Sequence, residues 1–146
     1  HMWGEFTTRY SMGMDPIEIP IASGCVLRSC QVHRRESKKP GYRPDWYAKT
    51  SYAAKMAEKI YGSVVFQNET QALARDVLMD MRRRIVARAP WLTYILNVYD
   101  ELIFEVDDDR VEEGAAIVEE EMSRPPEWAP DLPVGCEVSI LDAYEK

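Results

Sequence analysis

Two adjacent carboxylates, Asp100 and Glu101, interrupt a long apolar stretch of the chain. The runs on either side, 92–98 and 102–106, have the length of strands and are rich in β-branched and aromatic residues. This pattern predicts a β-hairpin with Tyr99, Asp100 and Glu101 at its tip. Paired strands would hold a carboxylate in a fixed position, which suits a ligand of a divalent metal ion. The alternative is a hairpin whose acidic tip is simply hydrated.

A helical pattern over about 68–89 precedes this hairpin, and Pro90 ends it. Gln71, Arg75 and Arg82 fall together on one face at helical spacing. An amide and two guanidinium groups aligned along a helix can contact the base edges and phosphates of DNA. The alternative is an ordinary solvent-exposed face. A second, broad face is apolar and is predicted to be core, with Leu73, Ala74, Val77, Leu78, Met81 and Ile85.

The charge of the chain is unevenly distributed. The net charge is −7, which by itself argues against a nucleic-acid partner. Between Arg28 and Ile60, however, nine basic residues stand against three acidic ones, whereas from Asp100 onward sixteen acidic residues accompany three basic ones. Residues 31–46 contain several breakers and are predicted to form a basic loop. This loop is either a solvated linker or a segment that faces phosphates.

The remaining composition limits the class of protein. With 146 residues, 46% of them hydrophobic, the chain is one domain or part of one, with a modest core. No apolar run has membrane-spanning length, so no membrane partner is expected. Cys25, Cys30 and Cys136 are too few and too scattered for a disulfide framework. Cys25 and Cys30 with His33 close by could suggest zinc, but the only fourth donor left is Cys136, far along the chain, so a zinc site is not expected. Reduced thiols and a cytoplasmic location are expected.

The other elements place the hairpin in a mixed fold. Residues 1–14 are expected to be a tag or a disordered start, because His1-Met2 resembles a cloning scar. The mixture of strands and helices predicts an α+β fold, with an antiparallel sheet packed against one long and one or two shorter helices. In chain order we first expect strands at 17–21 and 25–27, joined by a turn at Ser23-Gly24, and then the basic loop. A short helix within 47–61 would follow and end at Tyr61-Gly62, and the long helix would be capped by Asn68 or Thr70. After the acidic hairpin we expect a helix opened by Asp107–Asp109 and a final strand at 134–141.

The helix after the hairpin is predicted to be amphipathic. Its buried stripe would consist of Val111, Ala115, Val118 and Met122, and Glu119–Glu121 would be largely exposed. The irregular connection that follows, 127–133, would be held by Trp128 as a packing anchor.

Several segments in a fixed order together resemble the C-terminal half of the palm of family A DNA polymerases, the DNA polymerase I family, and above all its bacteriophage members. The resemblance covers most of the chain from about Ile17 onward. It rests on Ser23-Gly24-Cys25-Val26-Leu27-Arg28, on Tyr61-Gly62 followed by Thr70-Gln71-Ala72-Leu73-Ala74-Arg75-Asp76, on Tyr99-Asp100-Glu101 in place of the family's His-Asp-Glu motif C, and on Pro125-Pro126-Glu127-Trp128-Ala129-Pro130-Asp131-Leu132-Pro133.

The resemblance implies a role for individual residues. Asp100 would be a ligand of the catalytic Mg²⁺ ions, and Glu101 would support the metal site beside it. Gln71 would read the minor groove of the primer–template DNA, and Arg75 would follow on the same face. Tyr99 stands where the family has a histidine near the primer end; it can stack or donate one hydrogen bond, but it cannot become a cation.

The resemblance also implies that the chain, an antiparallel palm-type fragment over 15–146, is incomplete as an enzyme. We find neither the motif A aspartate nor the finger helix that holds the incoming dNTP, and two-metal catalysis needs ligands that clamp both ions. We therefore expect the small C-terminal subunit of a split polymerase, or a truncated chain, that is inactive without a larger chain carrying motif A, fingers and thumb. An exposed apolar surface would then drive association with that partner or with itself. The alternatives are a non-catalytic DNA-binding or polymerase-assembly module that retains the palm fold, and an unrelated α+β domain.

Overall fold

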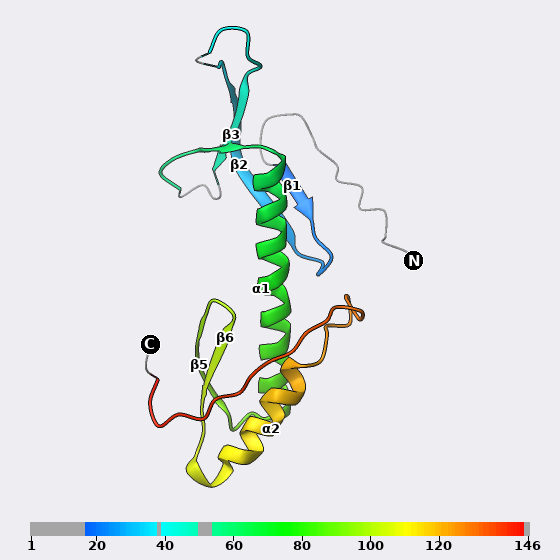
Figure 1. Ribbon diagram of the computed structural model, residues 1–146, viewed down its shortest axis with the longest axis vertical. Helices are drawn as coiled ribbons and strands as arrows, with labels where there is room; N and C mark the ends of the chain where they lie inside the picture. Colours follow the sequence, from blue (N-terminus) through cyan, green and yellow to red (C-terminus); the bar gives the residue numbers. More distant parts are fainter. Residues whose placement is uncertain (1–16, 38, 50–53, 145–146) are drawn as a thin grey trace. The chain divides into compact units, whose positions relative to one another are not determined.

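The computed structural model describes residues 17–37, 39–49 and 54–144, so the predicted start segment 1–14 lies outside the described residues. The chain divides into two compact units at the peptide bond between Leu73 and Ala74. The fold is α+β, with antiparallel strands and one long helix, as the sequence predicted (Figure 1). In chain order the elements are β1 (Ile17–Pro20), β2 (Val26–Arg35), β3 (Asp45–Lys49), β4 (Glu58–Ile60), α1 (Gly62–Arg88), β5 (Thr93–Val98), β6 (Glu101–Glu105), the 3₁₀ turn η1 (Asp108–Arg110) and α2 (Val111–Met122).

The first unit contains a four-stranded antiparallel sheet in the order β1-β2-β3-β4. The predicted turn between the first two strands is confirmed, and Gly24 adopts φ +88°, a conformation that glycine reaches without steric cost. Two backbone hydrogen bonds close this turn, from Gly24 N–H to Ile21 O (2.9 Å) and from Ile21 N–H to Cys25 O (3.0 Å). The buried side chains of the sheet are Ile19, Ile21, Cys30 and Ala48.

The prediction of a loop over 31–46 is wrong at both ends, whereas the described residues between 36 and 44 form no strand or helix. Strand β2 continues to Arg35, and β3 begins at Asp45. The two strands pair from Cys30↔Lys49 to Arg35↔Asp45, with an irregularity before His33. Polar and basic side chains can line a strand when they point to solvent, so the composition alone did not reveal the pairing.

The prediction of a short helix within 47–61 is also wrong where the structure describes these residues. Tyr47 lies in β3 and pairs with Lys59 of β4, while residues 50–53 are outside the described part. Gly62 does not end a helix but begins α1. The carbonyl of Tyr61 accepts the first helical hydrogen bonds, from Val64 N–H (2.9 Å) and Val65 N–H (3.1 Å), so the helix starts there rather than at the predicted caps.

Helix α1 therefore begins six residues before the predicted Asn68. Thr70, the other predicted cap, lies inside the helix, and its hydroxyl donates to the carbonyl of Phe66 at 2.9 Å. The predicted apolar face is only partly buried, because Leu78, Met81 and Ile85 are buried whereas Leu73 and Val77 are half-buried and Ala74 is exposed. The C-terminal half of α1 thus carries the core contacts.

The second unit is built around a small apolar core at the end of α1. Ile85, Ala89 and Leu92 are buried there, and half-buried side chains from β6, α2 and neighbouring residues pack against them, namely Trp91, Leu102, Phe104, Val106, Ile117, Val118 and Met122. Gly114 brings α2 close to this core, because a Cβ atom at this position would lie 3.1 Å from Cδ2 of Leu92. A side chain at Gly114 would therefore crowd a buried residue.

The acidic hairpin is confirmed as strands β5 and β6, which form a separate two-stranded sheet rather than part of one palm-type sheet. The register runs from Thr93↔Glu105 to Val98↔Glu101, with an irregularity between Tyr94 and Leu96. The helix predicted after Asp107–Asp109 is also confirmed, as η1 and α2. The predicted final strand is wrong, since residues 134–141 form no regular element. Over the described residues, no helix is both long enough and apolar enough to cross a bilayer.

Candidate functional site

The turn between β5 and β6 consists of Tyr99 and Asp100 alone, because Val98 already pairs with Glu101. Tyr99 adopts φ +53°, the left-handed conformation that most side chains avoid, and 87% of its surface is exposed. Asp100 is exposed as well. The strands thus present the Asp100 carboxylate at a tightly constrained tip, in water, where its charge carries no burial penalty.

Glu101 differs from its neighbour because it belongs to β6 rather than to the turn. Its Oε2 accepts a hydrogen bond from the hydroxyl of Tyr144 at 3.4 Å. This contact raises the pKa of Tyr144, through partial desolvation of the phenol first and the nearby carboxylate second. Within the described part of the chain, no ion pair engages the Asp100 carboxylate. The Glu101 carboxylate is therefore engaged by Tyr144, whereas the Asp100 carboxylate is available to a ligand.

The tip of the β5–β6 hairpin offers one carboxylate of the kind that binds Mg²⁺. Mg²⁺ usually keeps several waters and takes one or two carboxylates together with substrate phosphates. Asp100 offers such a carboxylate, with Glu101 next to it in sequence. Residues 17–37, 39–49 and 54–144 contain no group of three or more His, Cys, Asp or Glu side chains placed to hold a metal ion. Any full set of ligands would have to include donors from water, substrate or another chain.

The predicted polar face of α1 is only partly open. Gln71 and Arg75 are exposed and lie four residues apart, as the helical spacing predicted. Arg82 is half-buried, and its guanidinium lies 4.7 Å from the ring centre of Tyr94 on β5. Tyr94 is itself fixed, since its hydroxyl donates to Oδ1 of Asn97 at 2.8 Å. Arg82 is thus engaged in packing the hairpin against α1, whereas Gln71 and Arg75 are available to a ligand.

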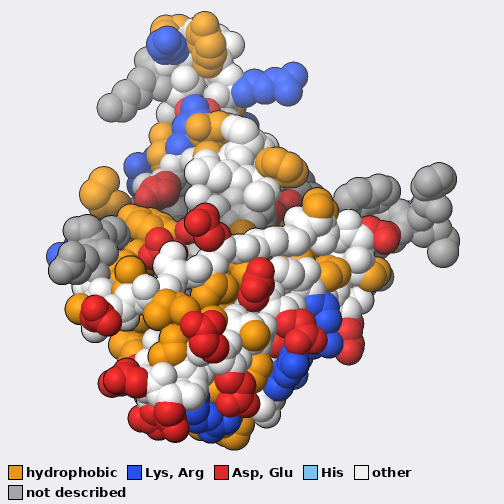
Figure 2. Space-filling model, turned by 60° about the horizontal axis from the view of Figure 1, so that its bottom comes forward, with side chains coloured by type: hydrophobic (Ala, Val, Ile, Leu, Met, Phe, Trp, Pro, Cys, Tyr) orange, Lys and Arg blue, Asp and Glu red, His pale blue; other side chains and the backbone are white. Residues whose placement is uncertain are grey.

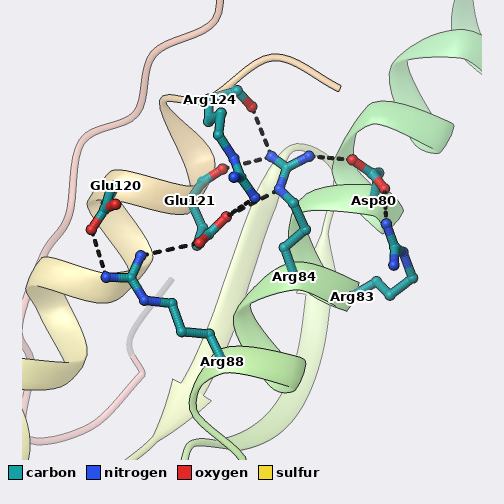
Figure 3. A network of polar contacts seen from close by, with 7 residues as sticks. All are labelled: Asp80, Arg83, Arg84, Arg88, Glu120, Glu121 and Arg124. Carbon is teal, nitrogen blue, oxygen red and sulfur yellow. Dashed lines mark hydrogen bonds and ion pairs between the residues drawn. The ribbon is translucent and has the colours of Figure 1, made fainter. Parts of the chain in front are cut away.

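Sequence reasoning missed the most connected polar group of the second unit, Glu121. The prediction that Glu119–Glu121 are exposed is wrong for this residue, whose side chain is only 7% exposed. Its carboxylate accepts hydrogen bonds from Nε of Arg84 (3.1 Å), Nη1 of Arg88 (3.1 Å) and Nη2 of Arg124 (2.8 Å), as Figure 3 shows. A signal was present, because Glu121 follows Gly114 by seven residues and so repeats on the buried face of α2.

Arg84 connects this carboxylate to the rest of the network. Its guanidinium pairs with Asp80 one turn earlier on α1 and donates through Nη2 to the carbonyls of Glu121 and Arg124, each at 2.7 Å (Figure 3). At the edge of the network, Arg88 pairs with exposed Glu120 at 2.7 Å. The hydrogen bond from Arg88 lowers the pKa of Glu120, and the two carboxylates raise the pKa of Arg88. The network joins α1 to the C-terminal end of α2.

A hollow of about 210 Å³ borders this network, and the predicted anchor Trp128 lies in its wall. The other lining residues are Asp80, Arg83, Arg84, Arg124, Pro125 and Glu127. The three arginines of this wall are already paired with Asp80 or Glu121. The cationic groups in the wall of the hollow are therefore already engaged within the protein.

Comparison of the chain with models of protein families, with curated proteins and with solved structures gives no match. The assignment of a function therefore depends on the residues themselves.

Proposed function

We propose that the chain is the C-terminal palm portion of a family A DNA polymerase and acts as the small subunit of a split enzyme. The observation that carries the proposal is the exposed Asp100 in a two-residue turn between paired strands, downstream of a long helix with Gln71 and Arg75 exposed. This arrangement agrees with what the sequence resemblance implies for motif C and the palm helix. The rest of the catalytic machinery would come from a larger chain with motif A, fingers and thumb.

In this proposal each residue of the tip has a distinct task. Asp100 would hold Mg²⁺, which when bound stabilises negative charge on the oxygens of the transferring phosphate. Glu101, held by Tyr144, would keep the start of β6 in place and add negative potential beside the metal. Tyr99, exposed at the turn, would stack on or donate a hydrogen bond to the primer end. Gln71 and Arg75 would contact the primer–template DNA, and the dNTP would bind mainly to the larger chain.

A second candidate is a palm remnant that binds DNA or a polymerase chain without supplying a metal ligand. Tyr99 favours it, because a residue that cannot become a cation occupies the position of the family's histidine. The two candidates differ in one respect only, which is whether loss of the Asp100 carboxylate abolishes catalysis.

The test is complementation of a family A polymerase chain that ends before its own C-terminal palm segment. We expect the mixture to extend a primer and either component alone to fail. Asp100→Asn should lower the extension rate by about 100-fold or more, since a metal ligand contributes several kcal/mol to the transition state. Glu105→Gln, which removes another exposed carboxylate of β6, is the matched control and should extend normally.

The outcomes separate the candidates. Extension by the Asp100→Asn mixture at the unmutated rate would exclude the catalytic role and leave the assembly module. Salt-dependent DNA binding that survives Asp100→Asn but is lost with Arg75→Gln would support the DNA-binding module. Failure of the unmutated mixture to extend primers with several family A partners would count against both.

A further inference from the structure

The outer half of the β2–β3 hairpin is a basic projection within a chain of negative net charge. In the described part of the chain, β1 pairs with Val26–Ser29, so β2 continues beyond it as a ribbon with β3, and β4 pairs with the other edge of β3 only at Trp46–Ala48 (Figure 1). This ribbon and its loop, which we call the basic hairpin (Arg34–Trp46), carry cations and aromatic rings: Arg34, Arg35, Lys39, Arg43, Tyr42 and Trp46. Acidic side chains are instead prominent over the second unit (Figure 2).

One arginine–aromatic set on this ribbon is already satisfied internally. The guanidinium of Arg35 lies 4.6 Å from the ring centre of Tyr47 and donates through Nε to Nε2 of His33 at 3.0 Å. The His33 ring stacks on Tyr47 with centroids 5.9 Å apart. Because Nε2 accepts from Arg35, the imidazole proton belongs on Nδ1, which donates to the carbonyl of Gln31 at 2.9 Å. These contacts hold the side chains of Arg35, His33 and Tyr47 against one another.

The second arginine–aromatic set is open. Arg34 and Trp46 are directly opposite each other on β2 and β3, so their side chains leave the same face of the ribbon. Both are exposed, and Trp46 shows 43% of its surface. No ion pair joins Arg34 or Arg43 to another described residue. In the loop, Tyr42 is 68% exposed, with Nζ of Lys39 5.6 Å from its ring centre.

This combination of groups matches one class of ligand. Unpaired cations attract phosphates, and exposed flat rings beside them offer stacking surfaces for bases. Bases of a duplex are stacked inside the helix and cannot use such rings, whereas those of a single strand can. An acidic peptide would satisfy the cations but not the rings. The complementarity is therefore to a single-stranded nucleic acid.

We propose that the basic hairpin binds single-stranded nucleic acid, with Trp46 and Tyr42 stacking on bases and Arg34, Lys39 and Arg43 contacting phosphates. The proposal does not depend on polymerase activity, because it concerns strands β2 and β3 rather than the tip at Asp100. The backbone and the base faces are shared by DNA and RNA, so the ligand is defined here by being single-stranded.

The test is fluorescence anisotropy of the full chain with labelled oligothymidylate of about 20 nucleotides, with oligouridylate and a duplex of equal length as parallel arms. We expect both single strands to bind more tightly than the duplex. Three cation contacts predict a log–log salt slope of about −2, so binding should weaken about 20-fold between about 50 mM and about 200 mM salt. Trp46→Leu should weaken binding about tenfold, whereas Trp46→Phe should retain most of it.

Arg34→Gln and Arg28→Gln form a matched pair. Both remove one exposed arginine from β2, but Arg28 pairs with Glu18 at 2.6 Å near the turn at Gly24, away from the basic hairpin. Arg34→Gln should weaken binding and reduce the magnitude of the salt slope by about 0.7, while Arg28→Gln should leave the slope unchanged.

Three results would overturn the proposal: equal effects of the two arginine variants, undiminished binding by Trp46→Leu, or equal competition by polyglutamate. Tighter binding of the duplex would also overturn it. Preference for oligouridylate over oligothymidylate, or the reverse, would support it and identify the kind of strand. The polymerase proposal is tested separately, by primer extension with the Asp100→Asn variant.

Discussion

Replacement of the buried Glu121 by glutamine is expected to lower the free energy of unfolding of the second unit by about 2–3 kcal/mol. A broken buried ion pair costs about 3–5 kcal/mol when the remaining partner is left without compensation. Here the main remaining partner, Arg84, is 11% exposed but retains Asp80 and two backbone carbonyls as acceptors. One shielded hydrogen bond to a charge contributes about 1.5–3 kcal/mol, and this loss dominates.

The other two partners add little to this cost. Arg88 and Arg124 are 41% and 59% exposed, so water replaces the lost carboxylate at both guanidinium groups. The amide introduced by Glu121→Gln would also retain one carbonyl acceptor for Arg84, which keeps the cost below the upper limit for a buried pair.

Urea unfolding followed by tryptophan fluorescence is the appropriate assay. With a slope of about 2 kcal/mol/M, the expected cost lowers the midpoint by about 1–1.5 M. Glu120→Gln is the matched control, because it removes the same charge from the adjacent residue, which pairs with Arg88 at the surface. The control should move the midpoint far less. Equal midpoints for the two variants would refute the claim that burial of Glu121 within the arginine network stabilises this unit.

Three further predictions concern other contacts. Because the folded state raises the pKa of Tyr144, its hydrogen bond to Glu101 contributes to stability below the ordinary tyrosine pKa and is lost as pH rises through the raised pKa. In a phenolate absorbance titration, Tyr144→Phe should remove a component that ionises above the ordinary tyrosine pKa, and an unchanged curve would disprove the contact. Gly114→Val should destabilise the protein by about 1–3 kcal/mol through overpacking, whereas Gly135→Val, where a Cβ meets nothing within 4 Å, should leave thermal unfolding nearly unchanged. Nitrogen NMR shifts of the His33 ring should show the Nδ1–H tautomer, and the Nε2–H tautomer would contradict the hydrogen bonds around the ring.

Elements with a strong local pattern were predictable from the sequence. The hairpin around Asp100 has apolar runs on both sides of a polar turn, and α1 has buried residues at helical spacing, so each pattern identifies its element without knowledge of its neighbours. The start of α1 was harder to predict, because the carbonyl of Tyr61 accepts the first helical hydrogen bonds and tyrosine is not a typical capping residue.

Elements that depend on distant partners were not predictable in this way. The second half of β2 is polar and basic, and only its pairing with β3 makes it a strand. The apolar segment 134–141 lacks such pairing and forms no strand. Burial of Glu121 depends on Arg84 and Arg88, which precede it by 37 and 33 residues. In the sequence alone, Glu119–Glu121 therefore has the pattern of an exposed acidic patch, because the arginines that pair with Glu121 are distant along the chain.

The contacts of Arg84 have a consequence for how α2 forms. This helix has 12 residues, which is marginal for an isolated peptide, and its last turn contains Glu119–Glu121, where the helix dipole disfavours negative charge. Ser123 N–H caps the carbonyl of Glu119, and Arg84 adds hydrogen bonds to the carboxylate and the carbonyl of Glu121, so α1 completes the capping of the C-terminal end of α2. Folding of α2 is thus conditional on α1, and amides of the two helices should acquire protection from hydrogen exchange as one cooperative group.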